Sequence, residues 1–297
     1  MENILSRLRR GETIVGDGAL GTQLIKRGLK HGEPPELFNI EKPQVIEDIA
    51  MQYFDAGAEI LETNTFGASP LRLEQFSLAH RMEDLNRSAV EAIRRVVGER
   101  AYIAGSVGPS AKNLDPLGDA EPEQLFDNFT AQIRILVASG VDIICIETMM
   151  DVAEAVLAVK AARSVSTDIP IIATMTFNNT PRGFFTLMNN SVSDAAVMLK
   201  NAGADIVGSN CGDGMENMVG IAREFRQCSQ LPVIIQGNAG LPTTGENGLV
   251  YPDTPEYMSG KVAELLKLGV QIVGGCCGTT PEHIRAIRSL VKEIVQG

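Results

Sequence analysis

The sequence predicts a single α/β domain of the (β/α)8 type, a TIM barrel, over residues 1–297. Eight short runs of apolar or β-branched residues recur along the chain, and segments with helical spacing lie between them. Strands that are apolar throughout are typical of a parallel sheet covered by helices, and eight such units close into a barrel. A chain of 297 residues that is 44% hydrophobic can bury the core of one such domain.

The expected strands cover residues 13–16, 59–62, 102–105, 143–147, 171–175, 205–208, 233–236 and 270–273. Helical spacing is clearest over residues 45–56, 82–97, 122–139 and 151–162. Residues 178–190 and 239–251 are polar or glycine-rich, which predicts long loops after the fifth and seventh strands. Loops that follow the strands form the active face of a barrel.

An open, doubly wound sheet is the alternative fold. Such a sheet favours a glycine-rich turn after its first strand, and residues 16–21 match the GxGxxG spacing. However, Asp17 would bring a negative charge to the phosphates of a bound dinucleotide, and no suitable acidic residue closes the second strand of a compact unit. The barrel is therefore favoured.

Composition excludes several classes of function. A net charge of −11 without a basic cluster argues against nucleic-acid binding. The first ten residues mix charged and apolar side chains, so they predict a helix and not a signal peptide, and no apolar run is long enough to cross a membrane. Five cysteines at irregular positions indicate a reducing cytoplasm, where thiols stay free.

Two adjacent cysteines follow the last predicted strand. Glycines on both sides of Cys276 and Cys277 let the chain bend, so that both side chains can reach one point. Pro281 then indicates the first turn of a helix. Because neighbouring thiols do not easily form a disulfide with each other, they predict a site for a soft metal such as zinc. Two buried core cysteines are the alternative.

Polar residues follow every predicted strand, which places them on one rim of the barrel. They are Asp17, Glu62, Thr63, Asn64, Ser106, Glu147, Thr148, Asn178, Asn210, Cys211, Asn238, Cys276 and Cys277. The ends of strands six and eight lie two places apart, so Cys211 can join Cys276 and Cys277 in a catalytic three-thiolate Zn²⁺ site. Three protein ligands leave one position open for an incoming thiol, whose pKa zinc lowers.

Other candidate residues have simpler interpretations. Asp17 and Glu147 suit a substrate ammonium group, although capping a turn is the alternative for Asp17. Cys145 lies inside the fourth strand and Cys228 near the end of a helix, so both are expected to be core or incidental residues. The three histidines have no spacing that indicates ligation, and His283 is expected to be structural or solvated.

Seven blocks of the sequence resemble the homocysteine S-methyltransferase family, over nearly the whole chain. They are residues 17–22 (DGALGT), 62–67 (ETNTFG), 105–109 (GSVGP), 147–148 (ET), 210–212 (NCG), 237–242 (GNAGLP) and 274–281 (GGCCGTTP). Within the family the pattern looks closest to the homocysteine-binding module of cobalamin-dependent methionine synthase. It is also similar to betaine- and S-methylmethionine-dependent members.

The resemblance implies a barrel whose zinc is held by the three rim cysteines. It also implies a site for the amino acid substrate, for which the candidate contacts are Asp17, Thr63, Ser106, Glu147 and Asn238. Asn238 is in addition a candidate for the fourth position on zinc when substrate is absent. Where relatives carry a proline before the Asn-Ala-Gly block, this chain has Gln236 and Gly237. The absence of Trp disfavours a betaine donor.

The sequence therefore predicts a cytoplasmic, zinc-dependent enzyme that methylates the thiol of homocysteine to give methionine. The chain ends soon after the eighth unit, so no folate or cobalamin module is expected. The donor is either a small molecule such as S-methylmethionine or a separate methyl-corrinoid protein that docks on the rim. Alternatives are another acceptor thiol within a corrinoid methyl-transfer system, and a non-catalytic zinc- or thiol-binding protein.

Overall fold

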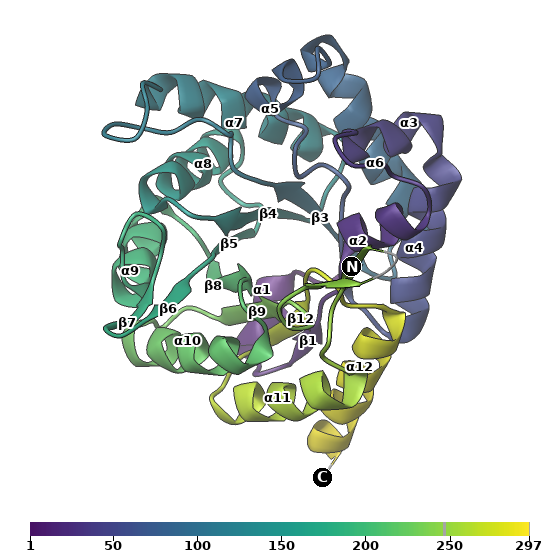
Figure 1. The fold of residues 1–297 in the computed structure, drawn as a ribbon, viewed down its shortest axis with the longest axis vertical. Helices are drawn as coiled ribbons and strands as arrows, with labels where there is room; N and C mark the ends of the chain where they lie inside the picture. Colours follow the sequence, from purple (N-terminus) through teal and green to yellow (C-terminus); the bar gives the residue numbers. More distant parts are fainter. Residues whose placement is uncertain (246–247, 297) are drawn as a thin grey trace.

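The computed structural model describes residues 1–245 and 248–296 and has the predicted barrel architecture (Figure 1). Its parallel strands are β1 (Ile14–Val15), β2 (Ile60–Glu62), β3 (Tyr102–Val107), β4 (Ile143–Met149), β5 (Ile171–Met175), β8 (Ile206–Cys211), β9 (Val233–Gly237) and β12 (Ile272–Gly275). Their order is β1-β12-β9-β8-β5-β4-β3-β2. The ring closes through a bridge between Gly16 and Ile60, supported by a 2.7 Å hydrogen bond from the Glu59 N–H to the Val15 carbonyl. The predicted fold class is confirmed.

The longer helices form a ring outside the strands (Figure 1). They are α4 (Pro43–Ala56), α6 (Met82–Val97), α7 (Pro122–Ala138), α8 (Val152–Val165), α9 (Val192–Ala202), α10 (Met215–Cys228), α11 (Pro255–Lys267) and α12 (Pro281–Gln296). Shorter elements are α1 (Ile4–Arg9), α2 (Leu20–Lys26), η1 (Pro35–Leu37), α3 (Phe38–Glu41), α5 (Pro70–Glu74) and η2 (Ala79–Arg81). Within the described ranges, none of these helices has the length and hydrophobicity that a membrane-spanning segment needs.

Several boundaries differ from the sequence predictions. β8 continues to Cys211 and β4 to Met149, so Thr148 and Cys211 lie in strands and not after them. β12 begins at Ile272, two residues later than expected, because its pairing with β1 starts at Ile14 and with β9 at Ile234. The strands were predicted from apolar runs. Because β4 and β8 end in polar residues, such runs could not predict where these strands end.

The two predicted long loops follow the fifth and seventh barrel strands as expected, and each also contains a short antiparallel hairpin. One hairpin consists of β6 (Asn178–Thr180) and β7 (Gly183–Phe185), and the other of β10 (Thr243–Gly245) and β11 (Gly248–Val250). A hairpin forms through hydrogen bonds between backbone groups, whatever its side chains are. A polar loop sequence therefore gives no sign of the hairpin.

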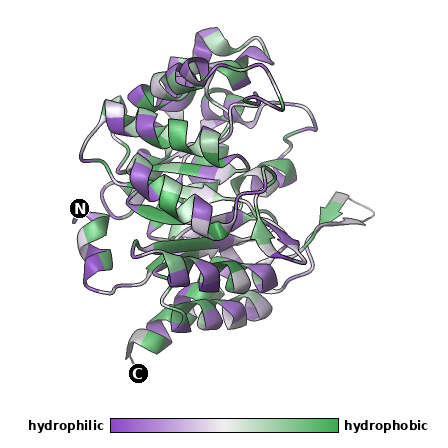
Figure 2. Ribbon diagram, turned by 90° about the vertical axis from the view of Figure 1, so that its left-hand side faces the viewer, coloured by the Kyte–Doolittle hydropathy of each residue, from purple (hydrophilic) through white to green (hydrophobic). Residues whose placement is uncertain are grey.

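Apolar side chains fill the barrel, and α1 closes its amino end. This inner core contains Ile4, Leu8, Ile14, Ile60, Tyr102, Ala104, Ile143, Cys145, Ile172, Ile206, Ile234 and Ile272. A larger apolar layer lies between strands and helices, and Figure 2 shows hydrophobic strands inside helices with hydrophilic outer faces. Cys145 is fully buried, as predicted.

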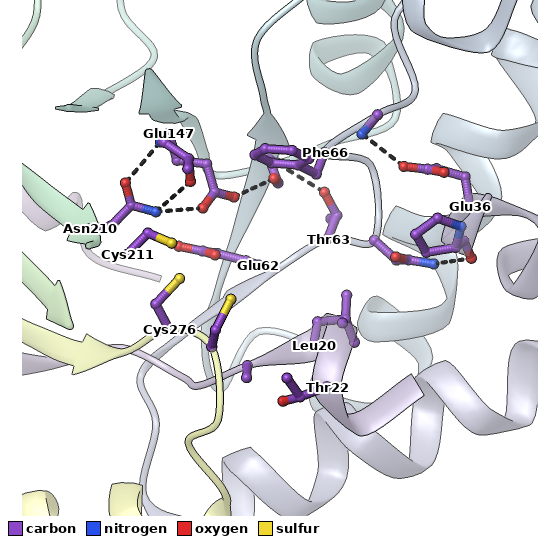
Figure 3. A pocket seen from close by; sticks show the side chains of 18 of the residues that line it. Leu20, Thr22, Glu36, Glu62, Thr63, Phe66, Glu147, Asn210, Cys211 and Cys276 are labelled. Atoms are coloured by element: carbon purple, nitrogen blue, oxygen red, sulfur yellow. Dashed lines mark hydrogen bonds between the residues drawn. The ribbon is translucent and has the colours of Figure 1, made fainter. Parts of the chain in front are cut away.

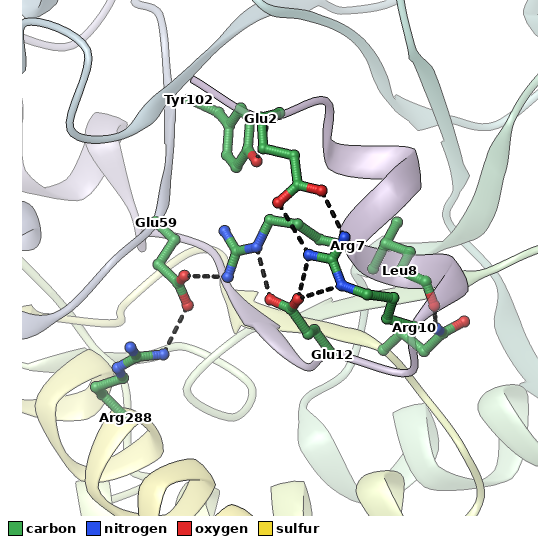
Figure 4. A network of polar contacts seen from close by, with 9 residues as sticks. Glu2, Arg7, Leu8, Arg10, Glu12, Glu59, Tyr102 and Arg288 are labelled. Carbon is green, nitrogen blue, oxygen red and sulfur yellow. Dashed lines mark hydrogen bonds and ion pairs between the residues drawn. The ribbon is translucent and has the colours of Figure 1, made fainter.

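A network of ion pairs fixes α1 against the amino end of the barrel (Figure 4). Arg7 contacts the Glu12 carboxylate at 2.8 Å and the Glu59 carboxylate at 2.7 Å, and Arg288 of α12 contacts Glu59 at 2.6 Å. Because α1 and these pairs close this end, a small molecule can enter the barrel from the carboxyl end of the strands.

Candidate active site

A cavity of about 430 Å³ opens at the carboxyl end of the strands (Figure 3). Its walls come from the segments after β1 and β2 and from the ends of β3, β4, β8, β9 and β12. This is the end at which barrels carry their active sites. A volume of this size is within the range of small-molecule pockets, about 300–1,000 Å³.

The thiols of Cys211, Cys276 and Cys277 meet in this cavity, with their sulfur atoms all within 4.8 Å of one another. Cys211 ends β8 and the other two follow β12, and β9 lies between these strands. The turn after Cys277 requires glycine, because Gly278 has a φ of +83° and a Cβ there would lie 2.1 Å from the Tyr251 ring. Backbone geometry therefore aims both adjacent thiols at one point.

Hydrogen bonds distribute charge unevenly among the three thiols. Cys211 accepts hydrogen bonds from the Cys276 and Cys277 thiols, which lowers its pKa. The pKa values of Cys276 and Cys277 are raised, first because each thiol bonds to Cys211. Three convergent sulfur ligands that favour a thiolate, with one side open to the cavity, fit a soft divalent cation of the zinc type.

Three carboxyl groups lie close together beside the thiols. Burial is the main cause that raises the pKa of Glu147, of Glu62 and of Asp17, and the charges of the neighbouring carboxylates raise the pKa of Glu147 and of Asp17 further. Glu62 and Glu147 lie close enough to influence each other's pKa. The arrangement therefore favours a shared proton or a bound cation such as an ammonium group.

Glu147 of β4 is held by side chains from β3 and β8 (Figure 3). The Ser106 hydroxyl donates to one of its oxygens, and the Asn210 amide donates to the other at 3.0 Å. Thr148 and Cys211, at φ of 58° and 64°, are non-glycine residues in the left-handed region. Such backbone conformations cluster at functional sites, and here they occur where β4 and β8 turn toward the cavity.

Six of the eight predicted site residues line the cavity: Thr63, Ser106, Glu147, Cys211, Cys276 and Cys277. Asp17 does not line it. Its carboxylate is 6% exposed and accepts a 2.9 Å hydrogen bond from the Glu62 N–H, which ties the end of β1 to β2. Asn238 also lies outside the lining, and its amide is 3.6 Å from the Cys211 sulfur and 2.6 Å from the Gly212 carbonyl.

His283 has the structural role that was expected of it. Its ring contacts the Thr280 hydroxyl at 3.0 Å and the Asp253 carbonyl at 2.9 Å, and the residue is buried. It therefore supports the segment after the two cysteines without facing the cavity.

Sequence reasoning placed Glu62 and Asn210 on this rim without giving them a role, and it missed Glu36, Phe66 and Arg72, which also line the cavity. Glu62 ends β2 as an acidic residue after an apolar run, the same signal that identified Glu147 in β4. Gln236, directly before Gly237, donates a 3.0 Å hydrogen bond to the Glu62 carboxylate. Arg72 lies well beyond the end of β2, so its position gave no such signal.

The fold and the site define a (β/α)8 protein with a small-molecule cavity of thiols and acids at its catalytic end. Residues 14–291 match the family of homocysteine S-methyltransferases, and the chain belongs to this family. It is 34% identical over 300 residues to methionine synthase of Mycobacterium tuberculosis, with 95% of this chain and 25% of that protein covered. It is 32% identical over 310 residues to betaine–homocysteine S-methyltransferase 1 of Rattus norvegicus, with 96% of this chain and 73% of that protein covered.

The chain thus spans about a quarter of the length of that methionine synthase. Among solved structures, the homocysteine methyltransferase MmuM of Escherichia coli in its metallated form has a TM-score of 0.78 at 20% identity. The match covers 97% of this chain and 99% of that chain, and it supports the barrel fold.

Proposed function

We propose that this protein is a zinc-dependent enzyme that transfers a methyl group to the thiol of homocysteine and so forms methionine. Membership of the homocysteine S-methyltransferase family supports the reaction. The observation that carries the zinc assignment is the convergence of Cys211, Cys276 and Cys277 within 4.8 Å in the cavity. These thiols must stay reduced, which favours the cytoplasm as the location.

Each residue of the cavity has a task in this reaction. Cys211, Cys276 and Cys277 would hold zinc, which would lower the pKa of an incoming thiol and keep its sulfur nucleophilic. The carboxylates of Glu147 and Glu62 bind the substrate ammonium group, whose positive charge offsets the repulsion between them. Ser106 and Asn210 hold Glu147 in place through their hydrogen bonds. Asp17 supports the site indirectly, because its carboxylate accepts a hydrogen bond from the Glu62 N–H and so fixes the backbone of Glu62.

Thr63 orients the wall opposite the thiols. Its hydroxyl bonds the Thr65 hydroxyl at 2.6 Å and accepts from the Ser106 N–H at 3.1 Å. The segments after β1 and β2 cover the substrate and exclude water from the reacting sulfur. Positioning and thiolate activation then account for most of the rate.

Metal content and methionine formation test the proposal together. Purified protein is analysed for zinc and is then supplied with homocysteine and, separately, S-methylmethionine, S-adenosylmethionine, betaine or a methylated corrinoid. We expect about one zinc per chain and methionine from at least one donor. Zinc-free wild-type protein that is active would refute the metal assignment, and zinc without methionine from every donor would refute the reaction.

Two variants make the test specific. Cys211→Ala should lose both zinc and activity, because two thiols bind zinc weakly. Cys228→Ala is the matched control, since Cys228 ends α10 outside the cavity lining and should leave both unchanged.

A further inference from the structure

We propose that Arg72 forms a second subsite of the cavity, which binds the carboxylate of a small-molecule methyl donor whose methyl group is carried by a positively charged sulfur or nitrogen. The inference rests on the proposed function and names the class of donor that it uses. S-methylmethionine and betaine are the two compounds of this class that the experiment separates.

The first observation is that Arg72 lines the cavity and forms no ion pair among the described residues. It is the only lysine, arginine or histidine in the cavity lining over the described part of the chain. Its Nε is buried and has no hydrogen-bond acceptor. A buried donor without an acceptor is unfavourable by roughly 1–3 kcal/mol, so this guanidinium gains from any ligand that supplies one. Carboxylates match its planar set of donors best.

The second observation concerns the acidic residues nearest to Arg72. The charge of Arg72 acts on Glu36 and Glu154, but among the described residues neither forms an ion pair with it. Glu36 instead accepts a 2.7 Å hydrogen bond from the Gly67 N–H, and Glu154 accepts one of 2.7 Å from the Ser110 N–H. Both carboxylates are thus committed to holding backbone segments, which leaves the guanidinium free for a ligand.

The third observation is the extent of the cavity. The same cavity of about 430 Å³ includes the thiols at one end and Glu36, Arg72 and Phe76 on the segments after β1 and β2. Phe66 lies between Glu147 and Glu36 (Figure 3). A small amino acid such as homocysteine, bound at the thiols and the Glu62–Glu147 pair, does not fill this space. Room for a second small molecule therefore remains beside the first.

The lining also suits the positive end of the donor. Glu36, Glu62, Glu147, Phe66 and Phe76 all line the cavity, and carboxylates and aromatic rings both attract an onium group. A donor whose carboxylate is held at Arg72 can direct its onium methyl toward the thiols. The substrate and the donor would then bind at different charged groups within one cavity.

The transfer balances without an oxidant or reductant. The homocysteine sulfur, having lost its proton to solvent, forms the new bond to the methyl carbon. The bond from that carbon to the donor heteroatom breaks, and its electron pair stays on the heteroatom and neutralises the positive charge. The donor leaves as a thioether when it is a sulfonium compound, or as a tertiary amine when it is betaine.

The experiment compares Arg72→Gln, Arg72→Lys and wild type, with Arg134→Gln on the outer face of α7 as a control. Initial rates of methionine formation are measured with S-methylmethionine, its carboxamide, betaine and methylcobalamin. Binding of S-methylmethionine is measured by calorimetry. We expect Arg72→Gln to raise both the KM and the Kd for S-methylmethionine by about tenfold or more, with an unchanged KM for homocysteine. Arg72→Lys should restore part of the loss.

The carboxamide makes the test specific to a charge pair. Wild type should use the carboxamide of S-methylmethionine as poorly as Arg72→Gln uses S-methylmethionine itself. Arg72→Gln should use the carboxamide as well as wild type does. Equal effects of Arg72→Gln on acid and carboxamide would overturn the subsite. Methionine from methylcobalamin alone would overturn it too, while leaving the proposed function intact. Methionine from no donor would refute both.

Discussion

The side-chain amide of Asn210 donates to the carboxylate of Glu147 across 3.0 Å, and Cys211 is the next residue in the chain. Asn210 also bonds the Thr148 hydroxyl at 2.8 Å, and its carbonyl oxygen accepts from the Thr148 N–H at 2.8 Å and the Thr174 hydroxyl at 2.9 Å. One amide therefore connects the acid that is proposed to hold the substrate with a thiol that is proposed to hold the metal.

This relationship predicts the effect of Asn210→Asp. The new carboxylate still accepts from Thr148 and Thr174, but it faces Glu147 with an oxygen where the wild type has a donor. Repulsion between two buried carboxyl groups raises the pKa of Glu147 further and weakens binding of an ammonium group. We expect the KM for homocysteine to rise about tenfold, with zinc content unchanged.

The control for this variant is Asn217→Asp, since Asn217 lies on α10 and accepts a 3.2 Å hydrogen bond from Asn179 at the surface. A carboxylate also accepts that bond, so kinetics should stay as in wild type. Loss of zinc from Asn210→Asp would show that Asn210 acts through Cys211 instead of Glu147.

The cysteines of the metal-free protein should differ in reactivity. The lowered pKa of Cys211 gives it the largest thiolate fraction at neutral pH, whereas burial raises the pKa of Cys145. After chelation, brief treatment with iodoacetamide should modify Cys211 first and leave Cys145 unmodified, as read by peptide mass spectrometry. Added zinc should protect Cys211. Protection of Cys228 to the same degree would contradict a specific site.

The barrel could be predicted from the sequence because its signal is local. Each strand is a short apolar run and each helix has its own spacing, so the order of elements follows without knowledge of contacts. The three thiols could be predicted for a related reason. Cys211, Cys276 and Cys277 lie at strand ends, and barrel topology alone brings such ends together.

The remaining site residues depend on contacts that no local pattern contains. Arg72 reaches the cavity from α5, well beyond the end of β2, and only the path of the chain places it there. Asp17 lies at a strand end as expected, yet its carboxylate turns to the Glu62 N–H beside it and away from the cavity. Strand-end position thus predicts proximity to the site but not the direction of a side chain.

A buried carboxyl group outside the cavity makes stability depend on pH. Burial raises the pKa of Glu154, although hydrogen bonds from Ser110 oppose this. The folded state therefore binds this proton more tightly than the unfolded state, and the resulting stabilisation is lost as pH rises through the folded pKa. Glu154→Gln keeps an acceptor for Ser110 and removes the titration. Between about pH 4.5 and about pH 7, Tm should fall less in Glu154→Gln than in wild type.

Glu99→Gln serves as the control, because Glu99 is exposed in the turn after α6. Its Tm profile should follow that of the wild type. A Glu154→Gln profile parallel to the wild type would show that Glu154 has the same pKa in both states.

The ion pairs at the amino end of the barrel should contribute to stability and not to activity. Glu59 joins Arg7 of α1 to Arg288 of α12, and its side chain is 20% exposed. Glu59→Ala leaves two partly buried guanidinium groups without this partner, so we expect the free energy of unfolding to fall by about 1–3 kcal/mol. The KM for homocysteine should not change, because the cavity lies at the opposite end.

Glu83→Ala is the control. It breaks an exposed pair with Arg87 and should change the free energy of unfolding by about 0.5 kcal/mol or less. Urea denaturation measures both, and equal effects would show that the network adds nothing beyond a surface pair.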